Sequence, residues 1–127
     1  MHRVHFSAVK IDWETPARVL LDLHKEFRFT YDPCPIGGED GLAVSWRGER
    51  VFCNPPYGPG IRPFLEKWRE PKLAVYLLPA RTDVKWFHDI CLRFAQEVRF
   101  LRGRLKFGDS ETSAPFASMV VVFGKVK

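Results

Sequence analysis

The sequence has no apolar run long enough to cross a membrane, and Met1-His2-Arg3 leads into nothing like a signal peptide. Its three cysteines, Cys34, Cys53 and Cys91, are an odd number and lack the paired spacing of a metal site. The two histidines near the amino terminus lie on a segment that we expect to fray. We therefore expect a cytoplasmic protein with reduced, mostly buried thiols and no metal.

The length and composition also exclude several classes of protein. At 127 residues, the chain has room for one domain and for no second module. Hydrophobic residues make up 46% and charged residues 28%, which is ordinary for a globular protein and argues against disorder. The 20 Lys and Arg residues exceed the 15 Asp and Glu residues, giving a net charge of +5. This excess suits a polyanionic partner, although many basic proteins bind no nucleic acid.

Hydrophobic periodicity predicts helices that alternate with strands. Thr15 is expected to cap the first helix, with Pro16 at its first position, and Leu20, Leu23 and Phe27 follow at helical spacing. Further helices are expected at 63–69 and 82–95, and strands at 29–31, 51–53, 73–78, 98–101 and 118–123. The alternation predicts an α/β fold, with a mainly parallel sheet and helices on both faces.

Three suggestive segments follow expected strands: Asp32-Pro33-Cys34, Asn54-Pro55-Pro56-Tyr57, and the stretch from Pro79 to Asp83. Ligands of such sheets bind outside the carboxyl ends of the strands. We therefore expect the three segments to converge on one cleft.

Asn54-Pro55-Pro56-Tyr57 is the most informative stretch and is similar to the active-site loop of enzymes that methylate exocyclic amino groups. Such an amine is a poor nucleophile, and two convergent acceptors can draw its nitrogen toward tetrahedral geometry. The Asn54 side-chain oxygen and the Pro55 carbonyl can serve as these two acceptors. Pro56 stiffens the loop, and Tyr57 offers a ring on which a flipped base can stack. The alternative is a Pro-Pro turn with a surface tyrosine.

Several motifs together resemble the phage-type DNA adenine methyltransferases, which use S-adenosylmethionine. The resemblance runs from about Asp12 to Phe123. Its marks, in order, are Asp12-Trp13-Glu14-Thr15-Pro16, Asp40-Gly41-Leu42, Cys53 to Gly58, Leu77 to Asp83, Trp86-Phe87-His88, Gly103 to Gly108, and Ala114-Pro115-Phe116. It implies a reduced Rossmann-like methyltransferase fold, formed by residues 1–127 as a single minimal domain. If the chain is phage-encoded, its compartment is the host cytoplasm.

The resemblance also assigns residues to the methyl donor. Glu14-Thr15-Pro16 is implied to hold the methionine carboxylate at a helix start. Asp32-Pro33-Cys34 is implied to pair with the donor's amino group, and Asp40 to accept from its adenine amine. The alternatives are a plain helix cap, a turn starter and a capping or loop aspartate, respectively.

The sequence departs from the larger relatives in its donor region. No Gly-x-Gly-x-x-Gly loop follows the first expected strand, and only residues 35–39 separate Cys34 from Asp40. The two strands and the acidic ribose ligand that larger relatives carry between these motifs are therefore not present in full.

A basic loop at residues 102–106 fits contact with DNA phosphates through Arg102, Arg104 and Lys106. Phe107 or Phe116 would supply a second stacking surface for the base. The alternative is a solvated hairpin with ordinary surface charges.

The resulting functional prediction is methyl transfer from S-adenosylmethionine to the 6-amino group of adenine in DNA, without a metal. Methylation of RNA guanine amines or of protein glutamine amides is the main enzymatic alternative, and an inactive DNA-binding relative is the other. A pure binding module has no reason to retain the donor, so donor binding separates that alternative from both enzymes. No recognition domain is visible, and we expect relaxed or very short-site specificity.

Overall fold

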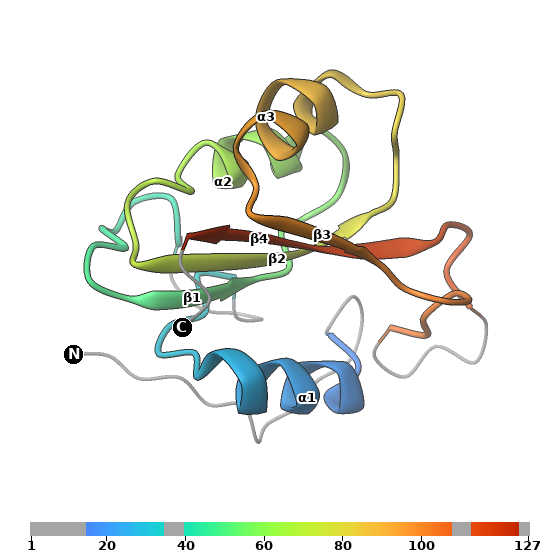
Figure 1. Ribbon diagram of the computed structural model, residues 1–127, viewed down its shortest axis with the longest axis horizontal. Coiled ribbons are helices and arrows are strands. Elements are labelled where there is room, and N and C mark those ends of the chain that lie inside the picture. The colour runs from blue at the N-terminus through green and yellow to red at the C-terminus, as the bar shows by residue number, and fades with distance from the viewer. Residues whose placement is uncertain (1–14, 35–39, 108–112, 125–127) are drawn as a thin grey trace.

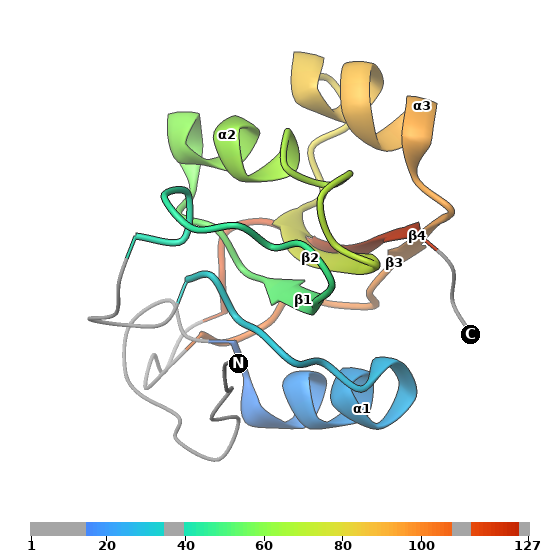
Figure 2. The same cartoon turned by 90° about the vertical axis from the view of Figure 1, so that its left-hand side faces the viewer.

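A computed structural model describes residues 15–34, 40–107 and 113–124 of the chain. Within these ranges a four-stranded sheet lies between helices on both of its faces (Figure 1). Helix α1 (Ala17–Phe27) covers one face, and α2 (Ile61–Leu65) and α3 (Leu92–Phe94) lie over the other, as Figure 2 shows from the side. The predicted α/β fold with helices on both faces is confirmed.

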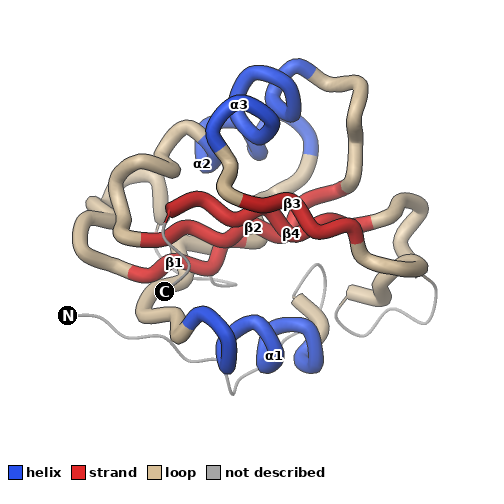
Figure 3. Tube along the Cα trace, viewed as in Figure 1, coloured by secondary structure: helices blue, strands red, loops and turns tan. Residues whose placement is uncertain are grey.

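The strands are β1 (Arg50–Cys53), β2 (Leu73–Pro79), β3 (Glu97–Phe100) and β4 (Ser118–Gly124), and they are hydrogen-bonded in the order β1-β2-β4-β3. Figure 3 shows the four strands in red between the helices. β1 pairs with β2 in parallel, whereas β4 is antiparallel to both β2 and β3. Among the described strands, β1, β2 and β3 therefore point the same way, and β4 is reversed. Tyr31 adds one parallel bridge to Val51 of β1.

The expected parallel pairing is wrong for β4, so the sheet is mixed. The chain turns back between β3 and β4 with no helix among its described residues. Backbone hydrogen bonds join its two arms, from Leu101 N–H to Ser118 O at 3.0 Å and from Ala114 N–H to Leu105 O at 2.8 Å. A parallel pair needs a crossover over a face of the sheet, so strands joined in this way are antiparallel.

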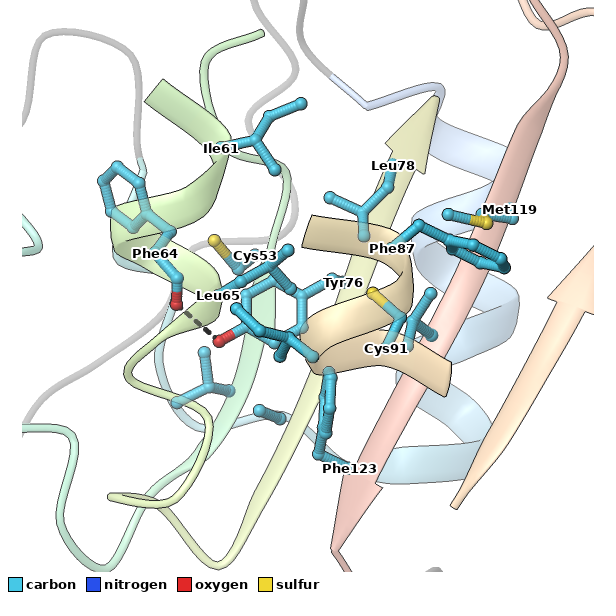
Figure 4. Packing of buried hydrophobic residues seen from close by; sticks show 14 of the residues in the cluster. Cys53, Ile61, Phe64, Leu65, Tyr76, Leu78, Phe87, Cys91, Met119 and Phe123 are labelled. Carbon is cyan, nitrogen blue, oxygen red and sulfur yellow. Dashed lines mark hydrogen bonds between the residues drawn. The ribbon is translucent and has the colours of Figure 1, made fainter. Parts of the chain in front are cut away.

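Two hydrophobic clusters hold the layers together. Successive side chains of a strand point to opposite faces, so Tyr76 and Leu78 of β2 pack toward α2 and α3, while Val75 and Leu77 pack toward α1. Figure 4 shows the first cluster, in which the buried Tyr76 hydroxyl donates to the Phe64 carbonyl at 2.7 Å. All seven residues of β2 are buried, which makes this strand the rigid centre of the fold.

Several boundaries differ from those expected from the sequence, most of all in the helices. Pro16, not Thr15, is the N-cap of α1, and no side chain caps the helix. Helix α2 begins at Ile61, two residues earlier than expected. The helix expected at 82–95 is shorter, because a turn at residues 82–84 follows β2 before a wide π turn (Phe87–Cys91) leads into α3. Such boundaries are the least determined part of a helical pattern.

The expected strand at 29–31 is reduced to an extended segment with the bridge at Tyr31. The irregular lead-in expected at 1–11 lies outside the described residues. Among the helices that the structure describes, none is both long enough and apolar enough to span a membrane.

Candidate active site

The candidate site lies at the sheet edge where β1, β2 and the Tyr31 segment end. These three run in parallel, so their carboxyl ends meet at one edge. Asp32 follows the Tyr31 bridge, Asn54 follows β1, and β2 ends at Pro79. The three segments that the sequence singles out therefore share this edge.

Asn54 is held by a residue far away in the sequence. Its Nδ2 donates a hydrogen bond to Oγ1 of Thr15 at 3.1 Å, across 39 positions of the chain. Thr15 is 8% exposed and directly precedes the N-cap of α1. The contact joins the start of α1 to the Asn54 loop, two segments that the sequence assigns to the donor and to the target amine, respectively.

The loop after Asn54 is short and stiff. Pro55 is buried, Pro56 is exposed, and Tyr57 is extended before a 3-10 turn, η1 (Gly58–Gly60), leads into α2. Two prolines in succession fix φ at both positions. The backbone carbonyl of Pro55 is therefore carried on a segment with little freedom to move.

Tyr57 belongs to an aromatic group with Phe107 and Phe116. Its ring meets the Phe116 ring edge-to-face at 5.2 Å between centroids, and the Phe107 ring at 6.1 Å. Phe107 is 3% exposed and packs in the cluster beneath α1, whereas Phe116 is half-buried. The structure favours Phe116 over Phe107 as a second surface for a base, because little of the Phe107 ring reaches solvent.

Asp32 opens a tight turn in which its Oδ1 accepts the backbone N–H of Cys34 at 2.8 Å. Burial raises the pKa of Asp32 to about 6, although the hydrogen bond from Cys34 acts in the opposite direction. Among the described residues, no Lys or Arg forms an ion pair with this carboxylate. Asp32 is thus a half-buried acid that lacks a countercharge in the described part of the chain.

The Asp40 segment lies directly against the Asp32 turn. A Cβ added to Gly41 would lie 2.0 Å from the Pro33 carbonyl oxygen, so this approach requires glycine. The buried Trp46 side chain also holds this segment, because its Nε1 donates to the Gly41 carbonyl at 2.9 Å. Asp40 itself is exposed, and its Oδ1 accepts the N–H of Leu42 at 2.9 Å.

Cys34 and Cys53 connect the same two segments, with 3.7 Å between their sulfur atoms. Burial, followed by the contact with Cys34, raises the pKa of Cys53 well above its usual value. Both thiols and that of Cys91 are free. Within the described ranges, no group of three or more His, Cys, Asp or Glu residues is arranged to hold a metal ion.

The basic loop follows β3 and leads into Phe107, which packs against Tyr57. Arg102, Arg104 and Lys106 are all exposed, and no described carboxylate pairs with them. Gly103 has φ of 75°, a conformation that favours glycine, and it turns the chain between the two arginines. The loop therefore presents three cations to solvent on a hairpin-like arm.

The structure brings most of the residues selected from the sequence to one edge. Side-chain contacts or adjacency in the sequence connect Asn54 with Thr15, and Asp32 with Pro33 and Cys34, and Gly41 joins Asp40 to them. Glu14 lies outside the described residues. Pro16 caps α1 through its backbone carbonyl, which accepts from Leu20 N–H at 3.1 Å.

Sequence reasoning missed two relationships at the site. It treated Cys34 and Cys53 as unrelated thiols, although each lies at the carboxyl end of an expected neighbouring strand, which is a signal that they meet. It also gave no role to Gly41, although glycine is the residue type that permits a close approach of two backbone segments. The partnership of Thr15 with Asn54 carries no local sequence signal.

Comparison with known proteins places the chain among methyltransferases. Residues 5–125 match the family model of DNA N-6-adenine-methyltransferase (Dam). No curated protein gives a significant match. The fold resembles a crystal structure of a "putative RNA methyltransferase" from Pyrococcus horikoshii, with a TM-score of 0.52 and 18% identity, over 69% of this chain and 48% of that one.

The structural neighbour and the family model support different statements. At 18% identity the neighbour shows the fold alone, and the chain spans about half of that protein's length. The reduced Rossmann-like methyltransferase fold expected from the sequence is confirmed by this likeness. The family match covers almost the whole chain. The chain therefore belongs to the DNA N-6-adenine-methyltransferase family, as its motifs predict.

Proposed function

We propose that the protein transfers a methyl group from S-adenosylmethionine to the exocyclic 6-amino group of adenine in DNA. The observation that carries the proposal is the Asn54 side chain, which is held through its Nδ2 at the carboxyl end of β1 and followed at once by Pro55. Because Nδ2 donates to Thr15, the two ends of this amide are distinguished, and Oδ1 is its acceptor end. An oxygen acceptor fixed in this way is what a weakly nucleophilic amine requires.

The residues on the donor side fit S-adenosylmethionine. The donor carries an ammonium group, and Asp32 is a half-buried carboxylate without a described countercharge. An ammonium group bound beside Asp32 would favour the charged carboxylate and so oppose the effect of burial on its pKa. Asp40 is exposed on the adjoining segment, close enough through Gly41 and Pro33 to belong to the same site. When bound, the donor supplies an electrophilic methyl group attached to a positively charged sulfur.

The proposed roles on the acceptor side follow from geometry and charge. Asn54 Oδ1 and the Pro55 carbonyl accept hydrogen bonds from the two N–H groups of the target amine. These hydrogen bonds favour tetrahedral geometry, in which the lone pair is localised on the nitrogen. The amine forms the new N–C bond as the S–C bond of the donor breaks, which leaves S-adenosylhomocysteine, and the methylated nitrogen then transfers one proton to water. Positive charge develops on that nitrogen, so both acceptors bind more tightly in the transition state than in the ground state.

The target base must leave its stack before these acceptors can reach it. Tyr57 is the ring adjoining the acceptors, with Phe116 beside it. An aromatic surface compensates for the lost stacking of a flipped or single-stranded base. Arg102, Arg104 and Lys106 supply affinity for phosphates without base specificity. With DNA as the acceptor, we expect the reaction to take place in the cytoplasm.

The proposal is tested by supplying labelled S-adenosylmethionine with DNA, RNA or protein and separating the labelled products. The expected result is label in N6-methyladenine from DNA. Label in guanine of RNA or in protein glutamine would mean that DNA adenine is the wrong acceptor, and it would leave the proposed donor site standing. The matched background control is Asn54→Ala purified in the same way. No binding of S-adenosylmethionine by calorimetry would overturn the enzymatic proposal altogether.

A further inference from the structure

The hydroxyl of Thr15 is used in an unexpected way. A threonine before a helix ordinarily accepts a backbone N–H of the first turn, but no side chain caps α1, and Pro16 is its N-cap. Thr15 Oγ1 instead accepts from Asn54 Nδ2 at 3.1 Å. The hydroxyl is therefore committed to the loop after β1 and not to the helix that it precedes.

The hydrogen bond to Thr15 matters because the two ends of an amide group differ in hydrogen bonding. The two ends have nearly the same size, but one is an acceptor and the other a double donor. An asparagine that turned its NH2 end toward a target amine would set donors against donors and lose the stabilisation of the developing charge. Holding the NH2 end elsewhere therefore determines which end meets the substrate.

We propose that Thr15 is a positioning residue that selects the productive orientation of the Asn54 amide. This inference rests on the proposed function, because it gives Thr15 a role in the same reaction through Asn54. It differs from the donor-site role that the sequence resemblance implies for Thr15. The 8% exposure of Thr15 supports it, since a shielded hydrogen bond competes little with water.

The first test compares two substitutions at this position. Thr15→Val keeps the shape but removes the hydroxyl, and it is expected to lower kcat about tenfold to a hundredfold, as small misplacements of a reacting group do. The donor Kd from calorimetry should change less than about twofold, because the hydroxyl binds Asn54. Thr15→Ser keeps the hydroxyl and is expected to recover most of the lost turnover.

A second test measures coupling between the two positions. In an Asn54→Ala background there is no amide left to orient, so adding Thr15→Val should cause no further loss of kcat. The inference would be overturned if, in that background, Thr15→Val lowered kcat by the same factor as it does in the wild-type protein. It would also be overturned by a Thr15→Val variant with unchanged kcat, or by one whose whole defect lies in the donor Kd. That last result would assign the hydroxyl to the donor.

A third readout does not depend on activity. The side-chain NH2 resonance of Asn54, identified by its loss in Asn54→Ala, should show one proton protected from exchange in the wild-type protein. Thr15→Val should remove this protection, and Thr15→Ser should retain it. If Thr15→Val does not fold, the spectrum of the wild-type protein is sufficient for the test. An Asn54 NH2 group with no protected proton would contradict the hydrogen bond to Thr15. A protected NH2 group in a protein that transfers no methyl would refute the proposed function but not the contact.

Discussion

Gly41 lies so close to Pro33 that even one methyl group on its Cα would meet the Pro33 carbonyl oxygen at 2.0 Å. The contact joins two segments, Asp32 to Cys34 and Asp40 to Leu42, that are implied to bind opposite parts of one donor molecule. Because the obstacle is backbone, it cannot move aside as the end of a flexible side chain can. The spacing of the proposed donor site therefore depends on a glycine at this position.

Gly41→Ala should accordingly separate the two segments. We expect the free energy of unfolding to fall by about 1–3 kcal/mol, the usual cost of overpacking, and the affinity for S-adenosylmethionine to fall with it. Urea denaturation and calorimetry measure the two quantities. The matched control is Gly60→Ala, whose added Cβ would meet only the Pro56 side chain, at 3.3 Å, and which should leave stability within about 1 kcal/mol. A Gly41→Ala variant that binds the donor normally would contradict this role.

Asp32→Asn should raise the free energy of unfolding of the donor-free protein and lower its affinity for S-adenosylmethionine. The folded-state pKa of Asp32 is about 6, above its ordinary value of 3.8, so the folded chain holds a proton between about pH 4 and pH 6 that the unfolded chain has released. The contribution of Asp32 to the free energy of unfolding therefore falls as pH rises through this window and stays low above it. Asp32→Asn removes the buried charge and should stabilise the donor-free protein at pH 8 by up to about 3 kcal/mol.

The comparison of Asp32→Asn with the wild-type protein should be made at pH 5 and pH 8. The stability gain should shrink at pH 5, where the wild-type carboxyl is itself mostly protonated. The variant should also lose affinity for S-adenosylmethionine, because a neutral amide cannot pair with an ammonium group. Equal stability of the two proteins at pH 8 would mean that the Asp32 carboxylate already has a countercharge.

The sequence predicts more of this site than of the sheet around it. Asn54 and Asp32 could be assigned to one edge because each follows an apolar run, and parallel strands bring their carboxyl ends together. The reversal of β4 could not be predicted, because its apolar residues are those of any buried strand and carry no direction. The contact between Thr15 and Asn54 could not be predicted either, since it depends on how α1 lies against the sheet.

Three substitutions of Tyr57 should distinguish stacking of its ring on a base from packing of its ring against Phe116. Its ring packs against Phe116, so Tyr57→Ala should lower both stability and substrate engagement. Tyr57→Leu keeps apolar volume but has no ring, and it should weaken DNA engagement by about 1–3 kcal/mol, or roughly tenfold to a hundredfold. Tyr57→Phe should bind DNA nearly as the wild-type protein does. A large defect in Tyr57→Phe would give the hydroxyl a direct role that stacking does not explain.

The basic loop should govern the salt dependence of DNA binding. Arg104 and Lys106 are exposed on the arm after β3, and each phosphate contact adds nearly one unit to the slope of log affinity against log salt. Replacing both with alanine should flatten this slope by up to about two units and leave the ranking of DNA sequences unchanged. The charge-matched control replaces Arg18 and Lys25, which are exposed on α1, and should leave the slope as it was. An altered ranking would mean that the loop reads bases.

The central claim is that Asn54 holds the target amine, and the most direct measurement is the single-turnover rate of adenine methylation by the wild-type protein and by Asn54→Ala. The account predicts a rate lower by about two to three orders of magnitude in the variant, because one preorganised acceptor is lost. The donor Kd should stay nearly constant. A variant that methylates adenine at the wild-type rate would contradict the account and reduce Asn54-Pro55-Pro56-Tyr57 to a structural turn.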